Sequence, residues 1–199
     1  MPKPEAALRR QRLILASGSP RRRELLERMG YSFTVLSPDV DEHVDAEPRQ
    51  AVAILARRKA LAAAEGLRDG VVLAADTLVA VDGEALGKPG DEAEARAMLM
   101  RLSGREHEVF TGVCLMDAAT GRIEVHVERT GVVFRALDIG EIERYVATGE
   151  PMDKAGAYGI QGGAAAFVES YSGSYENVMG LPVNSVGLML KKFLRASEV

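Results

Sequence analysis

The segment VVLAADTLVAV, residues 71–81, constrains the fold more than any other part of the sequence, because it is apolar at almost every position. A strand with one face in water alternates apolar and polar side chains, whereas a strand covered on both faces is a nearly continuous apolar run. The run is also far shorter than the roughly 20 apolar residues of a membrane-spanning helix. These residues therefore predict a buried strand in a sheet that other elements cover on both sides.

Glycines and prolines divide the rest of the sequence into segments with helical or strand periodicity. The predicted strands are 13–17, 32–36 and an antiparallel hairpin of 108–118 with 122–136. The predicted helices cover about 20–29, 48–65, 91–103 and 138–148, before a glycine-rich loop over 154–177 and a C-terminal helix that buries Val186, Leu190, Phe193 and Leu194. Because helices and strands mix without strict alternation, the sequence favours an α/β fold with a mixed sheet over a doubly wound parallel one.

Two short signals indicate where elements end and begin. Asp82-Gly83, directly after the apolar strand, predicts a turn. Asp91 and Glu94 have the spacing of a capping box, in which each side chain accepts a backbone N–H of the other residue. We therefore expect a helix that begins at Asp91 and stops near Gly104.

Composition limits the compartment and the partners. The net charge of −4 argues against a general nucleic-acid binder, but a small phosphate ligand needs only a local cluster of positive charge. The basic N-terminus is followed by an apolar run over 13–16 only, too short for the core of a signal peptide. The single cysteine, Cys114, rules out an internal disulfide and suits a reducing compartment. We expect a cytoplasmic protein that binds neither nucleic acid nor membrane.

The stretch LILASGSPRRREL, residues 13–25, has the order strand, Gly/Ser turn, helix start. Cations are disfavoured at the positive end of a helix dipole unless an anion is nearby. Free N–H groups there, with the hydroxyls of Ser17 and Ser19 and the planar forks of Arg21 and Arg22, suit phosphate. The alternative is a surface helix with solvated arginines. The pattern is not a P-loop, because the required Gly-Lys-Ser/Thr is missing.

Two charged residues occur where apolar ones are expected. Asp76 lies within the apolar strand, where an ionised carboxylate is costly without a partner, although it could also cap a turn. Lys59 falls on the apolar stripe of its helix, where a lysine most often extends its ammonium into water. Lys88, in the turn LGKPGD, is by itself an ordinary loop lysine.

Two loops have alternative interpretations as well. The acidic loop with Asp39, Asp41, Glu42 and Asp45 is either a solvated charge run or a source of carboxylates for a divalent cation shared with substrate phosphates. In the glycine-rich loop, the amide of Gln161 could recognise a nucleobase edge, or the segment could be flexible with no ligand. The histidines are scattered and show no zinc-binding spacing.

The order of several motifs along the chain resembles the Maf family of nucleoside triphosphate pyrophosphatases. The resemblance extends from about residue 13 to 182. The motifs are LILASGSPRRRELL, DE at 41–42, RRKA around Lys59, AADTLV, LGKP, LSGREHEVFTGV, KAGAYGIQG and SYENVMGLP. The family implies one domain, here residues 1–199, in which two α/β lobes flank a deep cleft, with a fold similar in outline to the inosine-triphosphate pyrophosphatases.

The resemblance also implies an activity and a set of site residues. The family hydrolyses a nucleoside triphosphate to the monophosphate and pyrophosphate with a divalent metal such as Mg²⁺, Mn²⁺ or Co²⁺. By position, Asp76 is the proton acceptor and a metal ligand with Glu42. The phosphate-contacting residues are Arg21, Lys59 and Lys88, of which the two lysines are assigned to catalysis.

Three positions resemble the subgroup of the family that cleaves dTTP and UTP: Arg21, Thr77 and Gln161. Modified pyrimidine triphosphates or inosine and xanthosine triphosphates are the alternative substrates. The family also makes a homodimer plausible. Its older name suggests a cell-division partner and a nucleotide-sensing role in septum formation, which would predict tight binding with little turnover.

Overall fold

β3 (Val71–Val81) is the central strand of a mixed sheet in the computed structural model, which describes residues 12–195. Within those residues the strands are β1 (Leu13–Ala16), β2 (Phe33–Val35), β3, β4 (Glu84–Leu86), β5 (Glu106–Asp117), β6 (Ile123–Phe134) and β7 (Val168–Ser172). Their order is β2-β1-β3-β5-β6-β7, and β4 pairs with β3. β1 runs parallel to β2 and β3, and the other pairs are antiparallel, which confirms the predicted α/β class with a mixed sheet.

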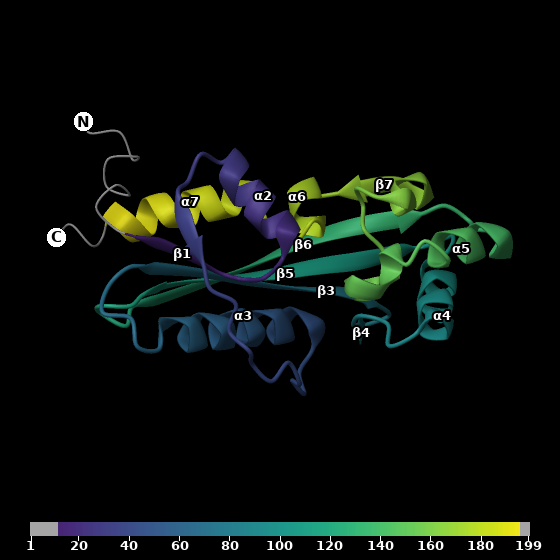
Figure 1. Cartoon of the computed structure of the whole chain (residues 1–199). Helices are drawn as coiled ribbons and strands as arrows, with labels where there is room; N and C mark the ends of the chain where they lie inside the picture. The colour runs from purple at the N-terminus through teal and green to yellow at the C-terminus, as the bar shows by residue number, and fades with distance from the viewer. Residues whose placement is uncertain (1–11, 196–199) are drawn as a thin grey trace.

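Helices cover both faces of this sheet (Figure 1). In the described chain they are α2 (Pro20–Arg28), α3 (Pro48–Ala64), α4 (Glu92–Leu102), α5 (Ile139–Val146), α6 (Tyr175–Val178) and α7 (Val183–Arg195), with short 3₁₀ turns η1 (Glu150–Asp153), η2 (Ala155–Ala157) and η3 (Gly163–Phe167). α3 lies under one face, and α2, α6 and α7 lie over the other (Figure 1). None of the helices that the structure describes has the length and apolar character needed to cross a membrane.

Alternation along β3 sends its side chains into two different cores. Val72 and Ala74 pack with Ala56 and Ala60 of α3, whose small side chains let helix and sheet approach closely. The residues between them, such as Leu73, join the larger core on the face covered by α2 and α7. This double burial is the reason that the strand is apolar at almost every position. The inward residues predicted for the C-terminal helix, Val186, Leu190, Phe193 and Leu194, are all buried.

Two expectations about local structure are wrong. At α4 the Asp91 side chain accepts the N–H of Glu94, but the Glu94 carboxylate accepts the N–H of Gly90, so the reciprocal half of the predicted box is missing. A complete capping box occurs instead at α5, between Asp138 and Glu141.

The segment predicted as a loop, 154–177, is also more regular than expected. It contains η2 and η3, the strand β7 and most of α6. β7 is an edge strand that pairs with β6 and exposes most of its polar side chains, so its sequence lacks the apolar alternation by which strands are recognised.

A gap in the pairing of β3 determines where a ligand could reach the sheet. On one edge β3 pairs with β1 as far as Ala74, and with β4 only from Val79 onward. Residues 75–78 therefore have no strand neighbour on that side, although β5 pairs with them on the other. β1 ends beside this gap, and the Gly/Ser turn and α2 follow it directly.

Gly112 of β5 lies opposite Asp76, and its missing side chain allows α3 to pack closely there. A Cβ at Gly112 would lie 2.2 Å from the carbonyl oxygen of Val52, a backbone atom that cannot rotate away. We therefore expect Gly112→Ala to destabilise the fold by about 3 kcal/mol, at the upper end of overpacking. Denaturant unfolding measures this. Gly87→Ala, where a Cβ meets nothing within 4 Å, is the control; equal midpoints for the two variants would contradict the account.

Candidate functional site

Lys59 joins two carboxylates beside the gap in β3. Its Nζ donates to Asp76 Oδ1 at 2.5 Å and lies 2.7 Å from Glu42 Oε1. Strand alternation aims Asp76 toward α3, and the helical stripe of α3 aims Lys59 back toward the sheet. Glu42 reaches them from the loop between β2 and α3. The Lys59 ammonium therefore contacts two carboxylates. The commoner behaviour of a lysine at such a position, with the ammonium extended into water, does not apply here.

The burial of this cluster makes its charges interact strongly. Asp76 is 7% exposed, and the Lys59 side chain is 13% exposed, whereas Glu42 is open to solvent. The hydrogen bond from Lys59 lowers the pKa of Glu42 below its ordinary value, with smaller contributions from the charges of Lys88 and Arg22. Both carboxylates share one ammonium, so the cluster has one more negative charge than positive.

Arg22 approaches the same gap from the opposite face of the sheet. Its Nη2 donates to Thr77 Oγ1 at 3.0 Å, its Nη1 to Ser17 Oγ at 3.2 Å, and its Nε to the carbonyl of Gly180 at 2.8 Å. Burial lowers the pKa of the Arg22 guanidinium, and the charge of Asp76 opposes that shift. None of the ion pairs found among residues 12–195 includes Arg22. Its guanidinium donates to three neutral acceptors, so its positive charge can still pair with a bound anion.

The start of α2 adds backbone donors to this side of the gap. Ser19 is the N-cap residue, but its side chain makes no capping hydrogen bond, and no acidic residue occupies the first turn. Its backbone N–H donates to Ser17 Oγ at 3.2 Å. Arg21 points elsewhere, toward Asp153 of η1 at 3.8 Å. The turn thus presents unpaired helix N–H groups and a cationic fork at one place, as an anion site requires.

The remaining predicted residues are exposed at the surface. Lys88 is exposed in the turn after β4, close enough to Glu42 for its charge to affect the carboxylate. Gln161 is exposed, and no hydrogen bond joins its side chain to another residue that the structure describes. The structure therefore brings together Asp76, Lys59 and Glu42 on one face and Arg22, Thr77 and Ser17 on the other. Among the described residues, no hydrogen bond or ion pair joins the side chains of Arg21 and Gln161 to either group.

The two carboxylates suit a divalent cation that is completed by substrate. Among the described residues no group of three or more His, Cys, Asp or Glu side chains could hold a metal. Mg²⁺ usually takes one or two carboxylates and fills its other positions with waters and phosphate oxygens. Glu42 and Asp76, which both reach the same ammonium, are the pair that fits this pattern.

Two residues beside the gap, one threonine and one glycine, are not obvious from the sequence alone. Thr111 of β5 lies opposite Thr77 in the sheet register and bonds to it at 3.0 Å. Gly180, in the motif MGLP, has φ +108° and lies against Arg22, so that a Cβ there would sit 3.5 Å from the Arg22 Nε. Both lie in motifs of the family resemblance, LSGREHEVFTGV and SYENVMGLP, but nothing in the sequence links them to Arg22.

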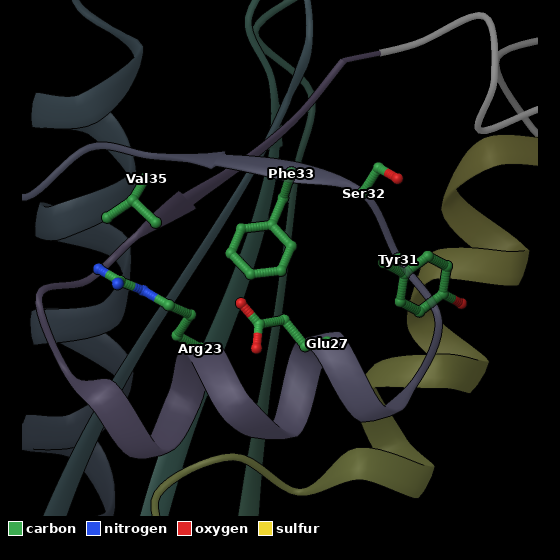
Figure 2. A pocket seen from close by; sticks show the side chains of 6 residues that line it. All are labelled: Arg23, Glu27, Tyr31, Ser32, Phe33 and Val35. Atoms are coloured by element: carbon green, nitrogen blue, oxygen red, sulfur yellow. The ribbon is translucent and has the colours of Figure 1, made fainter.

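A hollow lies outside this cluster, between α2 and the edge strand β2 (Figure 2). It is lined by Arg23, Glu27, Tyr31, Ser32, Phe33 and Val35. Figure 2 shows Arg23 and Glu27 rising from α2 toward the strand. None of these residues belongs to the gap in β3.

The fold and the gap together define an α/β protein in which a helix start and the Arg22 guanidinium lie near a buried aspartate. The family model described as Maf-like protein matches residues 12–193, so the chain belongs to the Maf-like protein family. A protein of Pelotomaculum thermopropionicum named dTTP/UTP pyrophosphatase is 51% identical over 183 residues, 91% of this chain and 96% of that protein. One of Symbiobacterium thermophilum with the same name is 55% identical over 185 residues, 92% and 94% of the two chains.

Proposed function

We propose that this chain hydrolyses dTTP and UTP to the nucleoside monophosphate and pyrophosphate. The relatives named dTTP/UTP pyrophosphatase support the activity and the substrates. One observation in the structure supports it most: a buried carboxylate, Asp76, and an arginine that pairs with no carboxylate of residues 12–195, Arg22, reach the same stretch of β3 from its two faces. A polyanion with a reacting phosphorus needs both groups within one site.

In the proposed reaction the triphosphate lies across residues 75–78. One lobe, with α2 and α3, flanks it on one side, and a second lobe, with β4, α4 and α5, flanks it on the other. Arg22 and the N–H groups of α2 bind phosphate oxygens, with Arg21 and Lys88 at the rim. Asp76 orients a water and accepts its proton as the oxygen attacks the α-phosphorus. The bond from that phosphorus to the bridging oxygen breaks, and pyrophosphate leaves with the electron pair.

Lys59 holds Asp76 and Glu42 in a fixed direction, because its ammonium contacts both carboxylates. A divalent cation held by Glu42 and Asp76 would supply charge neutralisation to the phosphate oxygens. Positioning and charge neutralisation should account for most of the rate, as in other phosphoryl transfers. Thr77 and Gln161 are proposed to distinguish pyrimidine from purine nucleotides.

The compartment and the partners belong to the same proposal. We place the enzyme in the cytoplasm, because its single cysteine, Cys114, forms no disulfide, as is usual in a reducing compartment. A homodimer and a cell-division partner stay predictions of the family resemblance.

A panel of nucleoside triphosphates, each with Mg²⁺, Mn²⁺ or Co²⁺, tests the proposal. We expect dTTP and UTP to yield one pyrophosphate per monophosphate at rates well above those of purine nucleotides. Successive release of orthophosphate would assign the protein to another class of hydrolase. Tight binding without turnover would favour the nucleotide-sensing alternative.

A further inference from the structure

A line of hydrogen bonds leads from Arg22 into the protein interior. Arg22 Nη2 donates to Thr77 Oγ1, and Thr77 Oγ1 lies 3.0 Å from Thr111 Oγ1. The Thr111 hydroxyl in turn donates to the backbone carbonyl of Asn177 at 3.0 Å. Thr111 and Asn177 are both fully buried, so water cannot substitute for a missing partner.

The direction of this line follows from counting protons. A hydroxyl group has a single hydrogen, and that of Thr111 is committed to the carbonyl of Asn177. Thr111 can therefore only accept from Thr77, so the hydrogen of Thr77 points toward Thr111. The lone pairs of Thr77 are left to accept from Arg22. All donors point away from the guanidinium, and bonds aligned in one direction strengthen one another.

The far end of the line is firmly anchored. The Asn177 amide donates to the carbonyl of Val109 and to the hydroxyl of Thr130, each at 3.0 Å. Asn177 belongs to α6, which lies beside α2 over the sheet (Figure 1). Gly180, just after α6, accepts the Nε of Arg22 directly. Two backbone carbonyls of this segment therefore fix Arg22. That of Gly180 accepts from Arg22 directly, and that of Asn177 acts through the two threonines.

These contacts leave part of the guanidinium free. An arginine has five N–H donors, of which three are used by Gly180, Ser17 and Thr77. One hydrogen remains on each terminal nitrogen, the arrangement that binds two phosphate oxygens side by side. Since no carboxylate among residues 12–195 pairs with Arg22, only these neutral acceptors fix its direction.

We propose that Thr111 is a positioning residue for phosphate binding, which acts through Thr77 to hold the Arg22 fork in the direction that receives the triphosphate. This inference rests on the proposed function for its substrate, but phosphate affinity can be measured without turnover. Thr111 itself touches no reacting atom.

The test compares three variants of the full chain. Thr111→Val replaces the hydroxyl with a methyl group of the same shape, and Thr111→Ser keeps the hydroxyl. Thr130→Val removes an equally buried hydroxyl that also holds α6 but does not touch Thr77. For each variant we measure the melting temperature, the dissociation constant for inorganic tripolyphosphate by calorimetry, and kcat and KM for dTTP.

We expect Thr111→Val to weaken tripolyphosphate binding and raise KM about tenfold, the effect of misaligning one hydrogen bond to an ion. Thr111→Ser should restore both values to within about threefold of the original chain. Thr130→Val should lower the melting temperature as much as Thr111→Val does, with a several-fold smaller loss of affinity.

Equal losses of affinity in Thr111→Val and Thr130→Val, or no loss in either, would overturn the proposal, because the role of Thr111 would then be structural only. If the original chain fails to release pyrophosphate, the proposed function falls, but the tripolyphosphate comparison still decides the role of Thr111.

Discussion

Asp76→Asn should lower kcat for dTTP by about a hundredfold or more, because the amide keeps the shape of the carboxylate but cannot accept the proton of the attacking water. The fold should be retained. Glu42 still pairs with the Lys59 ammonium in this variant, so no buried cation is left without a partner. Steady-state kinetics and a thermal melt of the same preparation measure the two effects separately.

A control for this variant lies six residues further along the chain. Asp82, in the turn after β3, pairs with Arg105 at the surface and is remote from the gap. Its φ of 55° is one that asparagine accepts readily, so Asp82→Asn should leave both the fold and the turnover unchanged. Near-normal turnover of Asp76→Asn would show that Asp76 is not the proton acceptor.

Arg22→Met should reduce kcat/KM for dTTP by about 10² to 10³, the usual effect of removing one preorganised donor to developing charge. Methionine keeps the unbranched apolar stem of the side chain and removes the charged guanidinium. Stability should fall by about 1–3 kcal/mol, because the Gly180 carbonyl and the Thr77 hydroxyl lose their charged donor.

The neighbouring arginine is the matched control. Arg23 lies on the other side of α2, where it lines the hollow against β2 (Figure 2). Arg23→Met removes the same charge from the same helix and should leave kcat/KM within about twofold, because a charge at the exposed surface is screened by solvent. Equal losses in the two variants would mean that the overall positive charge of α2 matters and not the direction of one side chain.

The sequence was a good guide to elements that bury an apolar face. β3, α3 and α7 are defined by apolar positions, and glycines such as Gly66, with φ +77°, end them where expected. β7 and α6 were missed because their stability comes from pairing with β6 and from the Asn177 anchor, neither of which leaves a local pattern. Short polar elements of this kind depend on tertiary contacts that periodicity does not reveal.

The candidate site could be predicted only in part. Asp76 and Lys59 stood out because charges are costly at apolar positions, and the structure joins them at 2.5 Å. Which of two adjacent arginines faces the gap could not be derived from the sequence, because they lie about 100° apart around α2 and the sequence does not fix the rotation of that helix. The structure directs Arg22 to Thr77 and leaves Arg21 with Asp153.

The central claim is that Asp76 directs water at the α-phosphorus of a triphosphate, and hydrolysis of dTTP in ¹⁸O-labelled water tests it most directly. Mass spectrometry of the products identifies the phosphorus that was attacked. The account predicts that the heavy oxygen enters the nucleoside monophosphate and that pyrophosphate carries none. Label in the pyrophosphate would show attack at the β-phosphorus and contradict the account.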